Sequence, residues 1–337
     1  MAGPRILLIR TSALGDVVHS LPVLTALRRA LPEARIGWVL EEAFAPLLED
    51  HPALDDLLLV RLRPWRRQLS RSSAWREFFG FLRALQAFSA DVALDLMGNH
   101  KSAAIAALSM ADRRVGLGRR WRREPSSAFW LSSTVAPRGR HAVERALSVL
   151  DALGLPAAAP DFGAQDLFPT PATEQTSPAA RRVLLHPGAG WANKIYPAAD
   201  WGEVARRIGE ARGVETRISA GPGERLLAER VVAASGGWAR PLGDESLADL
   251  AVAIRSSALV LGGDTGPVHL AHGMGVPVLC VMGPTDPEVH GPYGAPESAL
   301  FHRLPCSFCE RRLDSVKACL LEIPPATVAE RALALLG

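Results

Sequence analysis

The stretch Arg5-Ile-Leu-Leu-Ile-Arg10-Thr-Ser-Ala-Leu-Gly15-Asp16 decides the fold class. Its four consecutive apolar residues, between Arg5 and Arg10, are typical of a short buried strand. The small and polar residues up to Gly15 predict a turn, and Asp16 opens a run in which apolar residues recur at helical spacing. A strand that leads through a tight turn into a helix is the unit from which parallel sheets are built.

The same alternation continues along the chain. We predict strands at 34–40, 56–60, 91–95, 182–186, 215–219, 258–262 and 277–282, and helices at 101–110, 199–212, 224–234, 246–255 and 325–336. Residues 154–180 interrupt the rhythm with Pro, Ala, Ser and Thr, as a linker does. We therefore predict an α/β protein with two Rossmann-like doubly wound lobes: an N-terminal domain at 1–160, a linker at 161–180, a C-terminal domain at 181–322 and a final helix within 323–337.

The composition limits the class of protein. The 337 residues are 48% apolar and 22% charged, with a net charge of +3, which excludes wholesale disorder and argues against a dedicated nucleic-acid binder. The sequence shows neither a secretory signal nor an apolar run of about 18 residues, so we expect a soluble cytoplasmic protein. Lysine occurs only at Lys101, Lys194 and Lys317.

The loop Gly262-Gly-Asp-Thr-Gly-Pro-Val-His-Leu270 follows a predicted strand and precedes a predicted helix. Free amides at the start of that helix, with the hydroxyl of Thr265, would suit a phosphate. The alternative is an ordinary tight turn in which Asp264 caps the helix. Neither the P-loop pattern nor the G-x-G-x-x-G fingerprint of dinucleotide-binding proteins occurs.

A second glycine-rich loop, His186-Pro-Gly-Ala-Gly-Trp-Ala-Asn-Lys194, also follows a predicted strand. Gly188 and Gly190 would let a ligand approach the backbone closely, and Lys194 supplies a mobile charge suited to phosphate. The alternative is a plain surface turn. Two such loops in one lobe favour a ligand that carries phosphate.

The first lobe offers an acid and two clusters of arginine. Asp16 is either a helix cap or a general base. The arginines, at 61, 63, 66 and 67 and again within 119–123, either form a solvated surface or bind an anionic acceptor.

Cysteines gather near the end of the chain, at Cys306, Cys309 and Cys319, with His302 just before them. Such a set either holds zinc or iron as a structural site or consists of reduced thiols in an irregular loop. Cys280, in a predicted buried strand, is expected to serve packing.

Taken together, the motifs resemble the ADP-heptose:lipopolysaccharide heptosyltransferases of glycosyltransferase family nine over essentially the whole chain. The resemblance is carried by residues 6–22 (ILLIRTSALGDVVHSLP), 95–102 (DLMGNHKS), 141–145 (HAVER), 263–269 (GDTGPVH) and 283–287 (GPTDP).

The resemblance implies a GT-B fold and an inverting, metal-independent transfer from an ADP-sugar, with the active site in a cleft between the lobes and the final helix packing back toward the first. Asp16 matches the family's proposed base. The residues implied in donor binding are Lys194, Glu224, Asp264, Thr265, Gly266, His269, Gly188 and Gly190.

The acceptor implied is the Kdo sugar of the lipopolysaccharide inner core, because the arginine stretches look most like those of the branch that adds the first heptose. Acceptor-binding candidates are Arg63, Arg66, Arg67, Arg123 and Lys101. A lipid-linked acceptor implies peripheral contact with the inner membrane. The cysteine segment is more typical of other branches, so a second-heptose or protein acceptor stays open, as do a nucleotide-sugar epimerase and an inactive binding protein.

Overall fold

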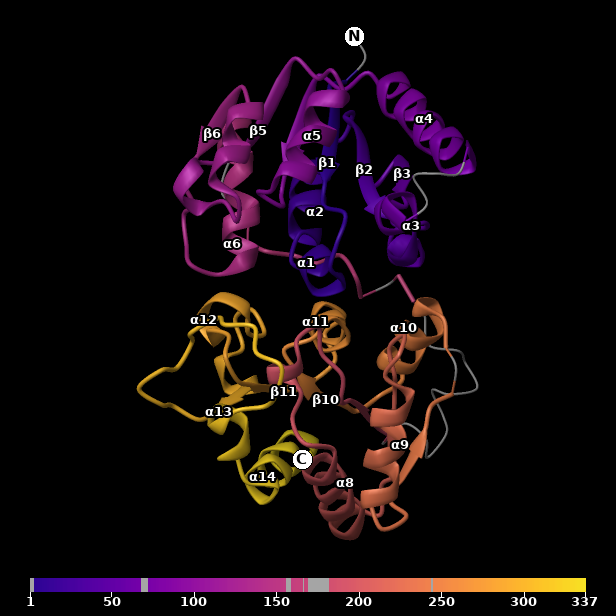
Figure 1. The fold of residues 1–337 in the computed structure, drawn as a ribbon, viewed down its shortest axis with the longest axis vertical. Helices are drawn as coiled ribbons and strands as arrows, with labels where there is room; N and C mark the ends of the chain where they lie inside the picture. The colour runs from indigo at the N-terminus through magenta and orange to yellow at the C-terminus, as the bar shows by residue number, and fades with distance from the viewer. Residues whose placement is uncertain (1–2, 68–71, 156–158, 166, 169–181, 244) are drawn as a thin grey trace. The chain divides into compact units, whose positions relative to one another are not determined.

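The computed structural model describes residues 3–67, 72–155, 159–165, 167–168, 182–243 and 245–337. The chain divides into two compact units, Met1–Gly163 and Ala164–Gly337. Each unit is built on a six-stranded parallel sheet with helices between the strands (Figure 1).

The first unit has the strand order β3-β2-β1-β4-β5-β6. Its strands are β1 Arg5–Ile9, β2 Arg35–Glu41, β3 Asp56–Val60, β4 Val92–Asp95, β5 Arg113–Leu117 and β6 Ser133–Val135. Its α-helices are α1 Leu14–Val18, α2 Leu21–Ala30, α3 Leu62–Arg67, α4 Ser72–Ala87, α5 His100–Leu108 and α6 Ala142–Leu147. Short 3-10 helices are η1 Glu42–Leu47, η2 Arg119–Trp121, η3 Pro125–Trp130 and η4 Ser148–Leu153.

The direction of each crossover decides which face of this sheet a helix covers. The chain moves one way across the sheet from β1 to β3 and the other way from β3 to β6. Because parallel crossovers are right-handed, α4, α5 and η3 fall on the face opposite α1 and α2. The contacts agree, since α5 packs against both α4 and η3.

The first βα unit forms where the sequence predicts it, with one difference. In β1 the residues Ile6–Ile9 are buried. The helix begins at Leu14 rather than Asp16, and it is split into α1 and α2. Pro22 stands near the start of α2 and has no N–H to donate to the preceding turn, so a continuous helix could not pass through this point.

The second unit has the strand order β12-β11-β10-β7-β8-β9. Its strands are β7 Val183–His186, β8 Thr216–Ile218, β9 Ala239–Pro241, β10 Leu259–Gly263, β11 Val278–Met282 and β12 Ala299–Phe301. Its α-helices are α8 Ala198–Arg212, α9 Arg225–Ala234, α10 Leu247–Arg255, α11 Gly266–Gly273, α12 Pro287–His290, α13 Ala318–Leu321 and α14 Pro325–Leu336. Two 3-10 helices are η6 Ala192–Lys194 and η7 Pro296–Ser298.

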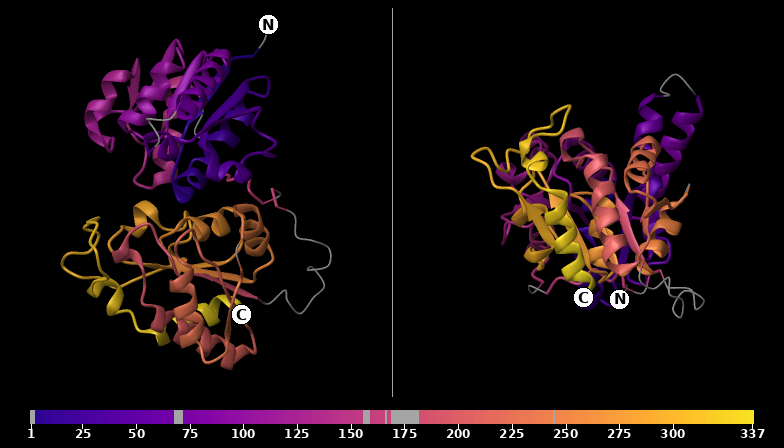
Figure 2. Two further views of the ribbon diagram at one scale, coloured as in Figure 1. Left: turned by 45° about the vertical axis from the view of Figure 1, so that its right-hand side comes forward. Right: turned by 90° about the horizontal axis from the view of Figure 1, so that it is seen from below.

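The last helix, α14, belongs to the core of the second unit. Val328, Ala329 and Ala332 are buried there, and α14 packs beside α8 and against β10 and β11 (Figure 2). Its apolar stripe covers part of the sheet face that α8 and α9 leave open. Packing of this helix back toward the N-terminal domain stays a prediction.

Of the expected linker at 161–180, residues 166 and 169–180 lie outside the described residues. Within the part of the chain that is described, no helix is both long and apolar enough to cross a bilayer.

Candidate functional site

The two glycine-rich loops of the second unit emerge from neighbouring strands. β7 and β10 pair in parallel, with His186 opposite Gly262, so the loops that follow them leave the same edge of the sheet side by side. The chain reverses its direction across the sheet between these two strands, which is where doubly wound folds bind ligands. The two loops are therefore well placed to act on one ligand.

A buried carboxylate, Asp264, organises this edge. Its Oδ2 accepts hydrogen bonds from Lys194 Nζ at 2.6 Å and from Thr285 Oγ1 at 2.7 Å. Its Oδ1 lies 2.9 Å from His269 Nε2. The hydrogen bond from His269 and the charge of Lys194 outweigh burial and hold the pKa of Asp264 well below its usual value, so it is ionised.

The bond to Asp264 thus holds the Lys194 ammonium in place at the carboxyl edge of the second sheet. Its side chain is 13% exposed, and Nζ also lies 4.3 Å from the centre of the Trp191 ring, in a cation–π contact. Arg312 stacks over the same ring at 4.5 Å. Trp191 therefore fixes two cations beside the loop that carries Gly188 and Gly190.

Thr265 is the N-cap residue of α11, and its side chain makes no capping bond to the helix. Gly266 is the first helical residue and Pro267, which lacks an N–H, is the second. The Thr265 hydroxyl and the first free amides of α11 form a donor group suited to an anion, next to the Lys194 ammonium.

The carboxyl of Glu224 faces the β7 loop. It accepts a hydrogen bond from the Gly221 amide at 2.8 Å and lies 3.4 Å from His186 Nε2. Burial raises the pKa of Glu224 and lowers the pKa of His186 to about 4, so His186 is neutral near pH 7. A Cβ on Gly188 would come within 2.1 Å of the Glu224 carboxyl, whereas a Cβ on Gly190 would meet nothing within 4 Å.

In the first unit, Asp16 lies in the first turn of α1, where its Oδ2 accepts a long hydrogen bond of 3.4 Å from the Ala13 amide. Its Oδ1 forms a 2.7 Å ion pair with Arg10, and the carboxylate stays 44% exposed. The roles of helix cap and general base are thus compatible for Asp16. One carboxylate oxygen accepts from the start of the helix, while the carboxylate as a whole stays open to solvent.

The loops after β1, β4 and β5 are tied together around Asp16. Asp95 and Arg122 form a fully buried ion pair, and Asp95 Oδ1 also accepts from the amides of Met97 and Gly98. The amide and hydroxyl of Thr11 contact Met97 Sδ at 3.3 and 3.4 Å. These contacts join three loops at the carboxyl edge of the first sheet.

The structure describes the side chains of only two of the five acceptor-binding candidates, Lys101 and Arg123. Lys101 is exposed in the first turn of α5, and Arg123 is exposed between η2 and η3. The loop from β4 to α5 and the segment between η2 and η3 are joined by the Asp95–Arg122 pair. The side chains of Arg63, Arg66 and Arg67 lie outside what the structure describes, although their backbone forms α3.

The cysteine segment does not gain support as a metal site. Among the described residues, no group of three or more His, Cys, Asp and Glu side chains is arranged to hold an ion. His302 turns to Glu322, at 3.0 Å, rather than to the thiols. Cys306, Cys309 and Cys319 are free thiols along an apolar cavity of about 380 Å³.

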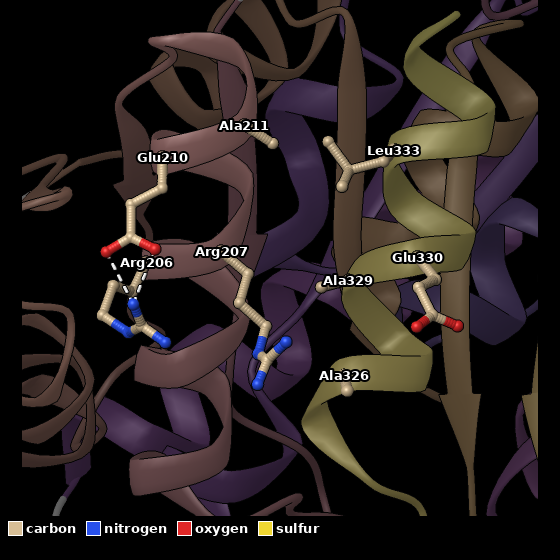
Figure 3. A pocket seen from close by; sticks show the side chains of 8 residues that line it. All are labelled: Arg206, Arg207, Glu210, Ala211, Ala326, Ala329, Glu330 and Leu333. Atoms are coloured by element: carbon tan, nitrogen blue, oxygen red, sulfur yellow. Dashed lines mark hydrogen bonds and ion pairs between the residues drawn. The ribbon is translucent and has the colours of Figure 1, made fainter.

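Another groove, of about 400 Å³, lies between α8 and α14 (Figure 3). It is lined by the Arg206–Glu210 ion pair and by small or apolar residues of α14, such as Ala329 and Leu333. None of the candidate site residues lines it.

Sequence reasoning missed three residues that complete these sites: Arg10, Trp191 and Thr285. Each stands inside a stretch that the sequence singles out, within 6–22, 186–194 or 283–287. The sequence does not show which of these side chains contact each other. Thr285, for example, donates to Asp264, which lies 21 residues earlier in the chain.

Comparison with solved structures agrees with this architecture. The chain matches the structure of E. coli heptosyltransferase WaaC with ADP at a TM-score of 0.83, with 26% identity over 98% of this chain and 99% of that one. It also matches E. coli ADP-heptose lps heptosyltransferase II in fold, at a TM-score of 0.75 and 20% identity over 98% of each chain. The predicted α/β fold of the GT-B class is confirmed.

The fold and the sites thus define a two-unit α/β enzyme of the glycosyltransferase class. The model of glycosyltransferase family 9 (heptosyltransferase) matches residues 78–320. Lipopolysaccharide heptosyltransferase 1 of Pseudomonas aeruginosa is 35% identical over 91% of this chain and 86% of its own, and its Escherichia coli K12 counterpart is 31% identical over 86% and 91%. The chain belongs to glycosyltransferase family 9.

Proposed function

We propose that this protein transfers heptose from ADP-L-glycero-D-manno-heptose to the Kdo region of the lipopolysaccharide inner core. The observation that carries the proposal is the 35% identity to a lipopolysaccharide heptosyltransferase 1 over 91% of the chain. A related structure, 26% identical, holds ADP-2-deoxy-2-fluoro heptose, which supports an ADP-sugar donor.

The second unit would bind the donor. In this proposal Lys194, Thr265 and Gly266 hold the diphosphate through an ammonium, a hydroxyl and helix amides. Asp264, which accepts from Lys194 and contacts His269, keeps both side chains in place beside the sugar phosphate. Glu224 would accept a hydrogen bond from the ribose across Gly188, and Gly190 would leave the backbone open to the ligand.

The first unit would supply the base. Asp16 takes the proton from the acceptor hydroxyl as that oxygen attacks the anomeric carbon of the heptose. The bond from this carbon to the phosphate oxygen breaks in the same displacement, and ADP leaves with the electron pair. The configuration inverts, and the negative charge that builds on ADP is stabilised by Lys194 and the amides of α11 without a metal ion.

The acceptor would be held by the cationic candidates of the first unit. Lys101, in the first turn of α5, and Arg123, between η2 and η3, follow β4 and β5 at the same sheet edge as Asp16. Arg63, Arg66 and Arg67 belong to α3, which follows β3. Arginine suits the carboxylate of Kdo because it can donate two parallel hydrogen bonds. Since such an acceptor is anchored in lipid, the protein would work in peripheral contact with the cytoplasmic face of the inner membrane.

The test is a transfer assay with ADP-heptose and a set of acceptors. We expect product with Kdo-lipid A and little with an acceptor that already carries the first heptose, or with protein. Product only on the heptosylated acceptor or on protein would move the enzyme to another branch of the family. An altered sugar nucleotide formed from donor alone would indicate an epimerase, and no turnover with any acceptor would indicate an inactive binding protein.

A further inference from the structure

The exposed large apolar side chains of the first unit gather on one helical layer. Among the described residues they are Trp75, Phe79, Leu108, Met110, Phe129 and Trp130. They come from α4, the end of α5 and η3, which share one face of the first sheet. In the second unit the corresponding residues are scattered over α9, β12, the cysteine loop and α13.

The aromatic residues of α4 form a stack that is open to water. Trp75 is 45% exposed and Phe79 is 52% exposed, with their ring centres 6.2 Å apart. Phe78 packs against both rings, at 6.2 and 5.6 Å, from the partly buried side of the helix. A stack that keeps its outer rings in solvent has a free-energy cost that an apolar partner would remove.

Hydrogen bonds from side chains to backbone carbonyls continue this surface from α4 to η3. The side chain of Gln86, near the end of α4, donates to the Leu108 carbonyl at 3.5 Å, next to the exposed Met110. Arg114 then donates to the carbonyls of Ala111 and Trp130, both at 3.0 Å. The exposed apolar residues therefore lie along one connected layer.

The stretch of sequence that carries these apolar residues has a surplus of positive charge. Residues 61–130 contain 14 Lys and Arg against 5 Asp and Glu, a formal charge of +9 in a chain whose total is +3. Arg76 and Arg83 are exposed on α4, and within the described residues neither forms an ion pair with a carboxylate. Arg119 stacks over Phe129 at 5.6 Å, so charge and aromatic surface are joined at η3 as well.

We propose that the outer surface of α4, the end of α5 and η3 docks onto a bilayer that carries anionic lipid headgroups. Trp and Phe prefer the interface between headgroups and acyl chains, and arginines beside them are attracted by an anionic leaflet. A small apolar partner would match the aromatic residues but not the charge. An anionic bilayer satisfies both along the whole layer.

The docking surface depends on the proposed function in one respect, because its purpose would be to bring the enzyme to a lipid-anchored acceptor. Its test therefore uses vesicles without donor or acceptor. Wild-type protein is spun with vesicles of phosphatidylcholine alone and with vesicles containing 30% phosphatidylglycerol. We expect binding to the anionic vesicles that weakens as salt is raised.

The variant Trp75→Ser/Phe79→Ser is expected to reduce the partition coefficient about tenfold. Its matched control is Leu226→Ser/Leu321→Ser, which removes two exposed apolar residues of the second unit and should bind like wild type. Circular dichroism and the melting temperature establish that both variants fold. Transfer to an acceptor dispersed in detergent should be unchanged in both.

Equal binding to neutral and anionic vesicles, or equal binding by wild type and the α4 variant, would overturn the proposal. A wild-type dimer that the α4 variant turns into a monomer, without vesicle binding, would assign the face to a second copy of the chain. If vesicle binding behaves as expected but wild type transfers no heptose in detergent, the proposed function fails and the docking surface stands.

Discussion

At the scale of single residues, Asp264 is the centre of the second unit's site. It accepts from Lys194 and Thr285 and contacts His269, and it is only 9% exposed. A buried carboxylate with three partners fixes the Lys194 ammonium before any ligand arrives. Such preorganisation lowers the entropy lost when a phosphate binds.

Lys194→Ala should raise the Kd for ADP about 10- to 100-fold, because a hydrogen bond to a charged group contributes about 1.5–3 kcal/mol. Isothermal titration calorimetry measures the Kd directly. Lys317→Ala is the matched control, since the Lys317 side chain is exposed and, among the described contacts, its ammonium donates only to the Ser315 hydroxyl. An unchanged ADP affinity in Lys194→Ala would reject the phosphate role.

His186 predicts how stability depends on pH. Its pKa falls from 6.5 to about 4 on folding, because burial disfavours the charged ring. As pH drops below 6.5 the unfolded chain takes up a proton that the folded chain does not, so folding weakens until pH reaches about 4. Between pH 7 and pH 5, the titration of His186 should lower the free energy of unfolding by about 2 kcal/mol.

The measurement is urea unfolding of wild type, His186→Asn and the control His100→Asn at both pH values. Wild type and the exposed His100 variant should lose stability alike. His186→Asn should lose less, and an equal loss in all three proteins would show that His186 does not titrate in this way.

At the scale of elements, the loop after β7 depends on two glycines with different roles. Gly188→Ala should destabilise the fold by about 1 kcal/mol and weaken ADP binding, because the new Cβ would push the end of the Glu224 side chain away from the Gly221 amide. Gly190→Ala should change stability by less than about 0.5 kcal/mol, since nothing lies near that Cβ. Thermal unfolding of the two variants checks the contrast, and equal melting temperatures would contradict it.

The sequence predicts the elements whose apolar residues form a continuous run or a helical repeat between turn residues. β1, β3, β10 and α8 fall within two residues of the predicted bounds, because the three strands contain uninterrupted apolar runs and α8 repeats its apolar residues at helical spacing. The three-residue edge strands β6, β9 and β12 were missed because they are too short to show any period. α4 was also missed, since Trp75 and Phe79 add apolar residues to its exposed side and blur the helical pattern.

The pairings within each site could not be predicted in the same way. The Asp95–Arg122 ion pair joins residues 27 apart, and the Asp264–Thr285 contact joins two different loops. Only the sheet order brings these positions together, and the sequence does not state that order. The chemistry of each loop is therefore readable from the sequence, whereas its partners need the fold.

At the scale of the whole molecule, the candidate site residues are divided between two units of similar construction. Each is a doubly wound sheet with candidate residues at the carboxyl ends of strands where the chain direction reverses. The first unit carries Asp16 and a surplus of arginine, and the second carries Lys194 and the start of α11. In the proposed function, the first acts on the acceptor and the second holds the donor.

The turnover of Asp16→Asn with ADP-heptose and Kdo-lipid A shows whether Asp16 is the base of a heptosyl transfer. The exposed Asp112→Asn in the same unit is the control. We expect Asp16→Asn to lower kcat by about 10²- to 10⁴-fold while the Kd for ADP stays within about twofold of wild type. Turnover equal to that of Asp112→Asn would contradict it.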